Sequence, residues 1–220
     1  MSFGQALFDQ QWQSLREYAR ERDITLLGGA PIFVAHDSAE VWAHRELFQL
    51  DAAGQPAFVA GVPPDYFSAT GQRWGNPWYD WDTMAKQDFA WWLDRLHTDL
   101  NRVDWLRIDH FRGLEAYWAI PVANETATYG EWRAAPGHAF LHAVQVRFGE
   151  IPLVAEDLGI ITPAVEALRD CFGLPGMKVL QFAFEQDPHK TYLPHNHRSD
   201  CIVYTGTHDN DTSVGWVTGL

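Results

Sequence analysis

Three short apolar stretches of this 220-residue chain each lead directly into a carboxylate, and longer helical patterns lie between them. The carboxylates are Asp109, Glu156 and Asp209. Short apolar strands that alternate with helices are typical of parallel α/β sheets. In a closed (β/α)8 barrel the carboxyl ends of the strands meet at one mouth, where catalytic residues gather. We therefore expect these three side chains to face one another, although they lie far apart in sequence.

The spacing of apolar residues predicts the order of the elements. Strands are expected over residues 24–27, 105–109, 151–156, 177–184 and 201–207. Helices are expected over residues 5–22, 84–102 and 138–148, and after Thr162. The Gly- and Pro-rich residues 51–81 are predicted to form a long functional loop. Five strands with helical or loop crossovers predict an α/β fold with a parallel sheet, closed or doubly wound.

Composition narrows the class of protein. The chain is 46% apolar, which is enough for a core, and no run approaches the roughly 20 apolar residues of a membrane helix. The first residues lack the basic flank and the apolar stretch of a signal peptide, so a cytoplasmic location is expected. A net charge of −13 disfavours nucleic acid and anionic membranes as partners. It favours a neutral or cationic ligand.

The three carboxylates suit glycoside chemistry. A single acid at a strand end is usually a helix cap, but three in succession, two of them beside His110 and His208, favour a shared site. In retaining glycosidases an ionised Asp attacks the anomeric carbon and a Glu of raised pKa protonates the leaving oxygen. Arg107, two residues before Asp109 on the same face of its strand, can keep that carboxylate charged and oriented. His208 and Asp209 would hold sugar hydroxyls.

At these residues the chain resembles a known family. RIDHFRG at 107–113, VAEDLG at 154–159 and GTHDNDT at 206–212 are similar to signature segments of the 4-α-glucanotransferases. These are the amylomaltases, or disproportionating enzymes, of glycoside hydrolase family 77 in the α-amylase superfamily. VAHDSAEVW at 34–42 and GVPPDYFSATGQRWGNP at 61–77 also match, and the wider superfamily does not share the second. The resemblance covers essentially the whole chain.

The resemblance implies a partial (β/α)8 TIM barrel with about strands 3 to 7. Chains of the family are longer at both ends, so residues 1–220 are expected to be a single partial catalytic barrel domain that lacks N-terminal and C-terminal parts. Open sheet edges would make such a domain marginal or aggregation-prone alone. A cooperative thermal transition of a soluble monomer would contradict that expectation.

The family's residue roles are transferred only to positions of this chain that match the family's motifs. The resemblance implies that Asp109 is the nucleophile, Glu156 the acid/base and Asp209 the stabiliser of the transition state. Sugar-binding residues implied in the same way are Arg107, His208, Asp65, Tyr66, Phe67, Gln72 and Trp74. The residues 65–67 resemble the tip of an acceptor-side loop, and an aromatic cover of this kind favours transfer over hydrolysis by limiting water.

The implied activity moves a maltooligosaccharyl segment between α-1,4-glucans by a retaining double displacement. Donors would be maltooligosaccharides, amylose or glycogen-derived glucans, acceptors would include glucose, and no cofactor or metal is needed. Two alternatives stay open at this point. An α-amylase-like hydrolase would release sugar to water, although the loop at 63–77 argues against it. An inactive truncated relic would bind glucan weakly or not at all.

One position departs from the family pattern. The family usually has an Asp where Gly29 stands, in its first signature segment, and Gly cannot replace the hydrogen bonds of that side chain. We therefore expect reduced activity or a displaced Arg107.

Overall fold

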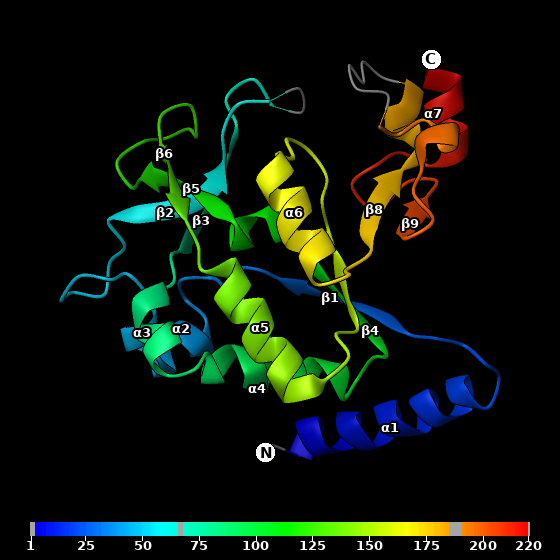
Figure 1. The fold of residues 1–220 in the computed structure, drawn as a ribbon. Helices are drawn as coiled ribbons and strands as arrows, with labels where there is room; N and C mark the ends of the chain where they lie inside the picture. Colours follow the sequence, from blue (N-terminus) through cyan, green and yellow to red (C-terminus); the bar gives the residue numbers. More distant parts are fainter. Residues whose placement is uncertain (1–2, 66–67, 185–190, 220) are drawn as a thin grey trace.

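The computed structural model describes residues 3–65, 68–184 and 191–219, which form sheets flanked by helices (Figure 1). The strands are β1 (Leu27–Pro31), β2 (Phe58–Val62), β3 (Gln72–Pro77), β4 (Trp105–Asp109), β5 (Ala116–Pro121), β6 (Glu131–Ala134), β7 (Leu153–Ala155), β8 (Gly176–Val179) and β9 (Cys201–Tyr204). The helices are α1 (Phe3–Arg20), α2 (Ala39–Ala43), α3 (Trp81–Lys86), α4 (Ala90–Leu100), α5 (Gly137–Phe148), α6 (Pro163–Cys171) and α7 (Ser213–Gly219). Within these ranges no helix is long and apolar enough to cross a membrane.

Parallel strands form the part of the fold that carries the three carboxylates. β4 lies between β1 and β7 and is parallel to both, and β8 pairs in parallel with β9. The backbone N–H of Ala155 on β7 donates to the carbonyl of Pro175, 2.8 Å away, just before β8. Helices α5 and α6 lie on the connections between these strands (Figure 1). The predicted parallel α/β arrangement is therefore confirmed for these five strands.

A second, antiparallel sheet in the order β3-β2-β5-β6 was not predicted. The expectation of a loop over residues 51–81 is wrong, because this segment contains both β2 and β3. β5 and the four-residue β6 lie in a region to which the periodicity assigned no strand. Strands this short depend on their neighbours across the sheet more than on their own pattern, so sequence alone does not reveal them.

Several predicted elements also have other boundaries in the structure, the first strand, the helix over 84–102 and the strand over 177–184 among them. The first strand is β1, residues 27–31, and it runs through Gly28 and Gly29 because the parallel ladder with β4 holds these glycines in register. The segment predicted as a helix over 84–102 is two helices, α3 and α4, separated where Asp88 and Phe89 adopt φ of 50° and 56°. The strand expected over 177–184 ends at Val179 and continues as a 3-10 helix, Leu180–Phe184.

Aromatic side chains fill much of the core between helices and sheets. Trp78, Trp92 and Tyr79 are fully buried, and the hydroxyl of Tyr79 donates to the carbonyl of Ile32, 2.6 Å away. The rings of Trp78 and Tyr117 stack with centroids 3.9 Å apart. Aromatic rings thus make up a large part of the buried core.

Gly61 on β2 illustrates how closely the antiparallel strands approach. A Cβ at this position would lie 2.1 Å from the carbonyl oxygen of Gln72 and 2.5 Å from Cδ1 of Ile120. We expect Gly61→Ala to lower the free energy of unfolding by about 1–3 kcal/mol, because β3 has to move. Gly4→Ala is the control, since a Cβ there meets nothing within 4 Å. Urea unfolding of both variants measures the difference, and equal midpoints would contradict the expectation.

Candidate active site

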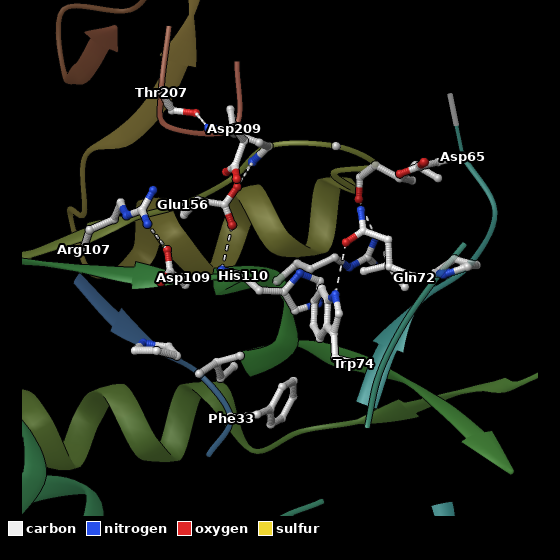
Figure 2. Close-up of a pocket in the computed structure, with 18 of the residues that line it drawn as sticks. Phe33, Asp65, Gln72, Trp74, Arg107, Asp109, His110, Glu156, Thr207 and Asp209 are labelled. Carbon is white, nitrogen blue, oxygen red and sulfur yellow. Dashed lines mark hydrogen bonds and ion pairs between the residues drawn. The ribbon is translucent and has the colours of Figure 1, made fainter. Parts of the chain in front are cut away.

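A cavity of about 710 Å³ lies at the carboxyl ends of β1, β4, β7 and β9 and extends over the antiparallel sheet (Figure 2). Eight of the sequence-predicted site residues line it: Asp65, Gln72, Trp74, Arg107, Asp109, Glu156, His208 and Asp209. The remaining two, Tyr66 and Phe67, lie outside the described residues. The expectation that the three carboxylates share one site therefore agrees with their positions around this cavity.

Asp109 is the last residue of β4, and Arg107 projects from the same face of that strand. The two side chains form an ion pair that Figure 2 marks with a dashed line. Burial raises the pKa of Asp109, while the Arg107 guanidinium opposes that rise. The ion pair orients the carboxylate toward the cavity that both residues line.

Glu156 follows β7 and is held by two backbone donors. The N–H of His110 donates to Oε2 at 2.6 Å, and the N–H of Leu158 donates to Oε1 at 3.2 Å (Figure 2). Burial raises the pKa of Glu156 to about 7 despite these two hydrogen bonds. A carboxyl with this pKa can give up a proton in one step and take one back in the next near neutral pH.

Asp209 and His208 follow β9 and are the most open part of the site. Their side chains are 80% and 77% exposed, and His208 Nε2 lies 3.6 Å from Asp209 Oδ1. The turn is fixed by Asn210, whose Oδ1 accepts hydrogen bonds from both the N–H and the hydroxyl of Thr207 at 2.9 Å. Within the described ranges no three His, Cys, Asp or Glu side chains are grouped as metal ligands.

Gln72 and Trp74 reach the cavity from β3 of the antiparallel sheet. The indole N–H of Trp74 donates to Gln72 Oε1 at 3.1 Å. The Trp74 ring meets the His110 ring edge-on, with centroids 4.8 Å apart. Asp65, before the undescribed residues, accepts a hydrogen bond from the N–H of Ser68 at 3.0 Å. The antiparallel sheet thus supplies one wall of the cavity, opposite the parallel strands that carry the acids.

Sequence reasoning assigned no role to three further residues at this cavity. His110 has a φ of 53°, its Nε2 is buried with no hydrogen-bond partner in the described part of the chain, and burial lowers its pKa to about 3. Arg112 is buried and lies over the ring of Trp132 on β6, with Cζ 4.0 Å from the centroid. His110 and Arg112 lie inside the RIDHFRG motif, which could have pointed to them. No sequence signal marks Trp132.

Gly29 lies opposite Arg107 in the β1–β4 register. A Cβ at Gly29 would be 3.8 Å from Arg107 Nη2 and 4.0 Å from Asp109 Oδ2. Arg107 keeps its ion pair with Asp109, so the displacement expected from Gly29 is not seen. A Cβ at this position would therefore be in ordinary van der Waals contact with both side chains.

Comparison with known proteins gives consistent matches over the whole chain. The family model described as 4-alpha-glucanotransferase matches residues 1–219. The 4-alpha-glucanotransferase of Thermus thermophilus is 57% identical over 217 residues, which are 98% of this chain and 43% of that protein. The same-named protein of Synechocystis sp. is 56% identical, over 97% of this chain and 43% of its own length.

A solved structure matches equally well. The amylomaltase from Streptococcus agalactiae in complex with acarbose superposes with a TM-score of 0.93 and 43% identity, over 98% of this chain and 44% of its own. The chain thus spans less than half the length of the relatives it matches. The resemblance inferred from the motifs is confirmed.

Proposed function

The chain belongs to the 4-alpha-glucanotransferase family, glycoside hydrolase family 77, and from that membership we propose that it carries the catalytic cavity of an α-1,4-glucan transferase. The proposed donors are maltooligosaccharides, amylose or glycogen-derived glucans, and the acceptors are glucose or another maltooligosaccharide. We further propose that β1, β4, β7, β8 and β9 are strands 3 to 7 of a (β/α)8 barrel, and that residues 1–220 form a single, partial catalytic domain.

The observation that carries the proposal is the contrast between Asp109 and Glu156 in one cavity. Asp109 is paired with a guanidinium, while Glu156 is held by backbone N–H groups and has a pKa of about 7. Two carboxyls in such different environments suit two roles, one as nucleophile and one as proton donor.

The proposed reaction is a double displacement. In the first step Asp109 attacks the anomeric carbon, the bond to the leaving glucan breaks, and Glu156 gives its proton to the departing oxygen. In the second step Glu156 takes the proton of the acceptor hydroxyl, whose oxygen displaces Asp109 and restores the original anomeric configuration. Asp209 and His208 would hold hydroxyls of the distorted ring. Arg107 keeps Asp109 aimed at the reacting carbon.

Transfer rather than hydrolysis requires an acceptor sugar close to the intermediate. Gln72 and Trp74, with Asp65 beyond them, are suited to this position because they line the cavity on the wall opposite the acids. Trp74 is 38% exposed, so part of its ring can stack on a sugar while the ring also contacts His110. An acceptor stacked there would limit access of water to the glycosyl ester.

Incubation of the purified chain with maltotriose tests the proposed function. Transfer predicts glucose together with maltotetraose and longer chains, resolved by size. Hydrolysis predicts glucose and maltose without longer products, and would favour the amylase-like alternative. Glu156→Gln is the control for contaminating activity, because it removes the proton donor and changes no other group. Retention on immobilised amylose without any turnover would favour the inactive alternative.

The rate should depend on pH through both carboxyls. The first step needs a protonated Glu156, so kcat/KM should fall as pH rises through about 7. It also needs an ionised Asp109, and because burial raises the pKa of that carboxyl, activity should be lost at a higher pH than for an ordinary Asp as the solution is acidified. A bell-shaped profile with maltotriose would agree with this assignment. A rate that does not fall as pH rises through about 7 would contradict it.

Restoring the usual family residue at position 29 should raise activity. In Gly29→Asp the new carboxylate would come within reach of the Arg107 guanidinium and add an oriented acceptor beside Asp109. We expect the maltotriose transfer rate to rise by on the order of tenfold or more. Gly29→Asn is the matched control, since it has the same shape without the charge. A lower rate in Gly29→Asp would mean that the new carboxylate draws Arg107 away from Asp109.

A further inference from the structure

Arg112 is a buried arginine that lines the cavity, and burial lowers its pKa while the charge of Glu115 acts to raise it. Its side chain lies in the 3-10 helix Phe111–Leu114, directly after the cavity residues of β4, and it is 6% exposed. No carboxylate among the described residues forms an ion pair with it. Burying a guanidinium without such a partner costs free energy. Its Nη1 donates to the backbone carbonyl of Ile160, and its guanidinium stacks on Trp132. The hydrogen bond therefore goes to a loop, not to a charge.

The loop that contains Ile160 also donates a hydrogen bond to Glu156, from the N–H of Leu158. It runs from Asp157, which is anchored by Arg169 and by the N–H of Met177, to the start of α6. Gly159 within it has a φ of 82°, and a Cβ there would meet nothing within 4 Å. Between Asp157 and the start of α6, the described part of the chain shows one hydrogen bond from outside the loop. Arg112 donates it. Hydrophobic packing also holds the loop, because Leu158 packs against the cluster of Val179, Phe182 and Tyr192 and Ile161 packs against the main core.

The chain segment that contains Arg112 therefore reaches both oxygens of Glu156. The N–H of His110 binds Oε2 directly, and Arg112, two residues later, binds the loop whose Leu158 N–H binds Oε1. We propose that Arg112 is a positioning residue for Glu156, which it aligns by fixing the Leu158 N–H against Oε1. The inference rests on the proposed function only for the role of Glu156.

The charged and titratable groups around Glu156 determine how its pKa should respond when the Arg112 hydrogen bond is lost. Arg107 and Asp109 face it from β4, His208 and Asp209 line the same cavity from the turn after β9, and His110 is neutral because burial lowers its pKa to about 3. The Leu158 hydrogen bond lowers the pKa of Glu156, so its loss should raise that pKa further above the ordinary value.

Arg112→Met tests the proposal, since it keeps an apolar stem under Trp132 and removes the bond to Ile160. Amide hydrogen exchange by NMR should show the Leu158 N–H exchanging about fivefold faster, because one net hydrogen bond of roughly 1 kcal/mol is lost. The His110 N–H should exchange as before. The side-chain carboxyl carbon of Glu156 should titrate at a higher pH. Where turnover is measured, kcat should fall while KM stays constant.

Arg133→Met is the matched control. Arg133 also stacks on an aromatic ring, with Cζ 4.0 Å from the Phe58 centroid, but no hydrogen bond joins it to the loop after Glu156. It should leave Leu158 exchange and Glu156 titration unchanged. Arg112→Lys keeps the charge and should recover part of both values. If Arg112→Met does not fold, Arg112→Gln replaces it, since its amide is too short to reach Ile160.

Unchanged Leu158 exchange and unchanged Glu156 titration in the Arg112 variants would overturn the proposal. So would equal changes in Arg133→Met, because they would reflect a general loosening of the fold. Neither readout requires turnover, so an inactive chain in the maltotriose assay would count against the proposed function and leave this test intact.

Discussion

Asp109→Asn should lower the rate of transfer from maltotriose by at least about 10,000-fold, the size of effect seen when a residue that acts in covalent catalysis is removed. The amide oxygen is a poor nucleophile, and the substitution also removes the charge that Arg107 pairs with. The side chain is only partly exposed, but Asn has the same shape, so the fold should persist. Size-resolved products from maltotriose measure the effect, and circular dichroism checks the fold.

A donor with a good leaving group separates the nucleophile from the proton donor. Fluoride leaves an α-maltosyl fluoride without needing protonation, so Glu156→Gln should form the glycosyl ester from it at close to the wild-type rate. Asp109→Asn should remain slow with both donors, since it lacks the attacking group. If Asp109→Asn stays within tenfold of the wild-type rate on maltosyl fluoride, the nucleophile lies elsewhere in the cavity.

The shared cavity of the three acids followed from local sequence and one rule of topology. Asp109 ends one apolar strand, Glu156 directly follows another, and parallel strands present their carboxyl ends at one edge. Neither step needs knowledge of long-range contacts other than strand order. For the same reason the Arg107–Asp109 pair was foreseen, because residues two apart on a strand share a face.

The opposite wall of the cavity could not be foreseen in this way. Trp132 reaches it because β6 pairs with β5, and β5 with β2, although these segments lie far apart in sequence. Their registers depend on packing partners that the local pattern does not specify. The prediction that the first strand ends before Gly28 and Gly29 failed for a similar reason. Glycine weakens an isolated strand but is tolerated where a neighbouring strand supplies the hydrogen bonds.

Burial distinguishes the two adjacent acids of the VAEDLG segment, which sequence alone treats alike. Glu156 faces the cavity, whereas Asp157 is 2% exposed and points into the fold. There it pairs with Arg169 of α6, accepts a hydrogen bond from the N–H of Met177 at 2.7 Å, and has Lys178 Nζ 4.0 Å away. This one carboxylate therefore joins β7, α6 and β8.

Asp157→Asn should consequently be the most destabilising single substitution that we consider. It leaves the Arg169 guanidinium, whose side chain is 6% exposed, without its buried counter-charge, and breaking such a pair costs about 3–5 kcal/mol of unfolding free energy. Arg169 keeps a second ion pair, with the partly exposed Asp170, so the effect should lie toward the lower end of that range. Denaturant unfolding, followed by tryptophan fluorescence, measures the loss.

The matched control is Asp200→Asn, which removes the same kind of charge from an arginine, Arg198, at the surface. Both partners there are about half exposed, so water solvates the arginine that is left behind, and the unfolding midpoint should not move. Equal effects of the two substitutions would mean that burial does not set the strength of the Asp157 pair. A large loss of unfolding free energy confined to Asp157→Asn would instead show that Asp157 stabilises the fold. The catalytic role would then rest with Glu156.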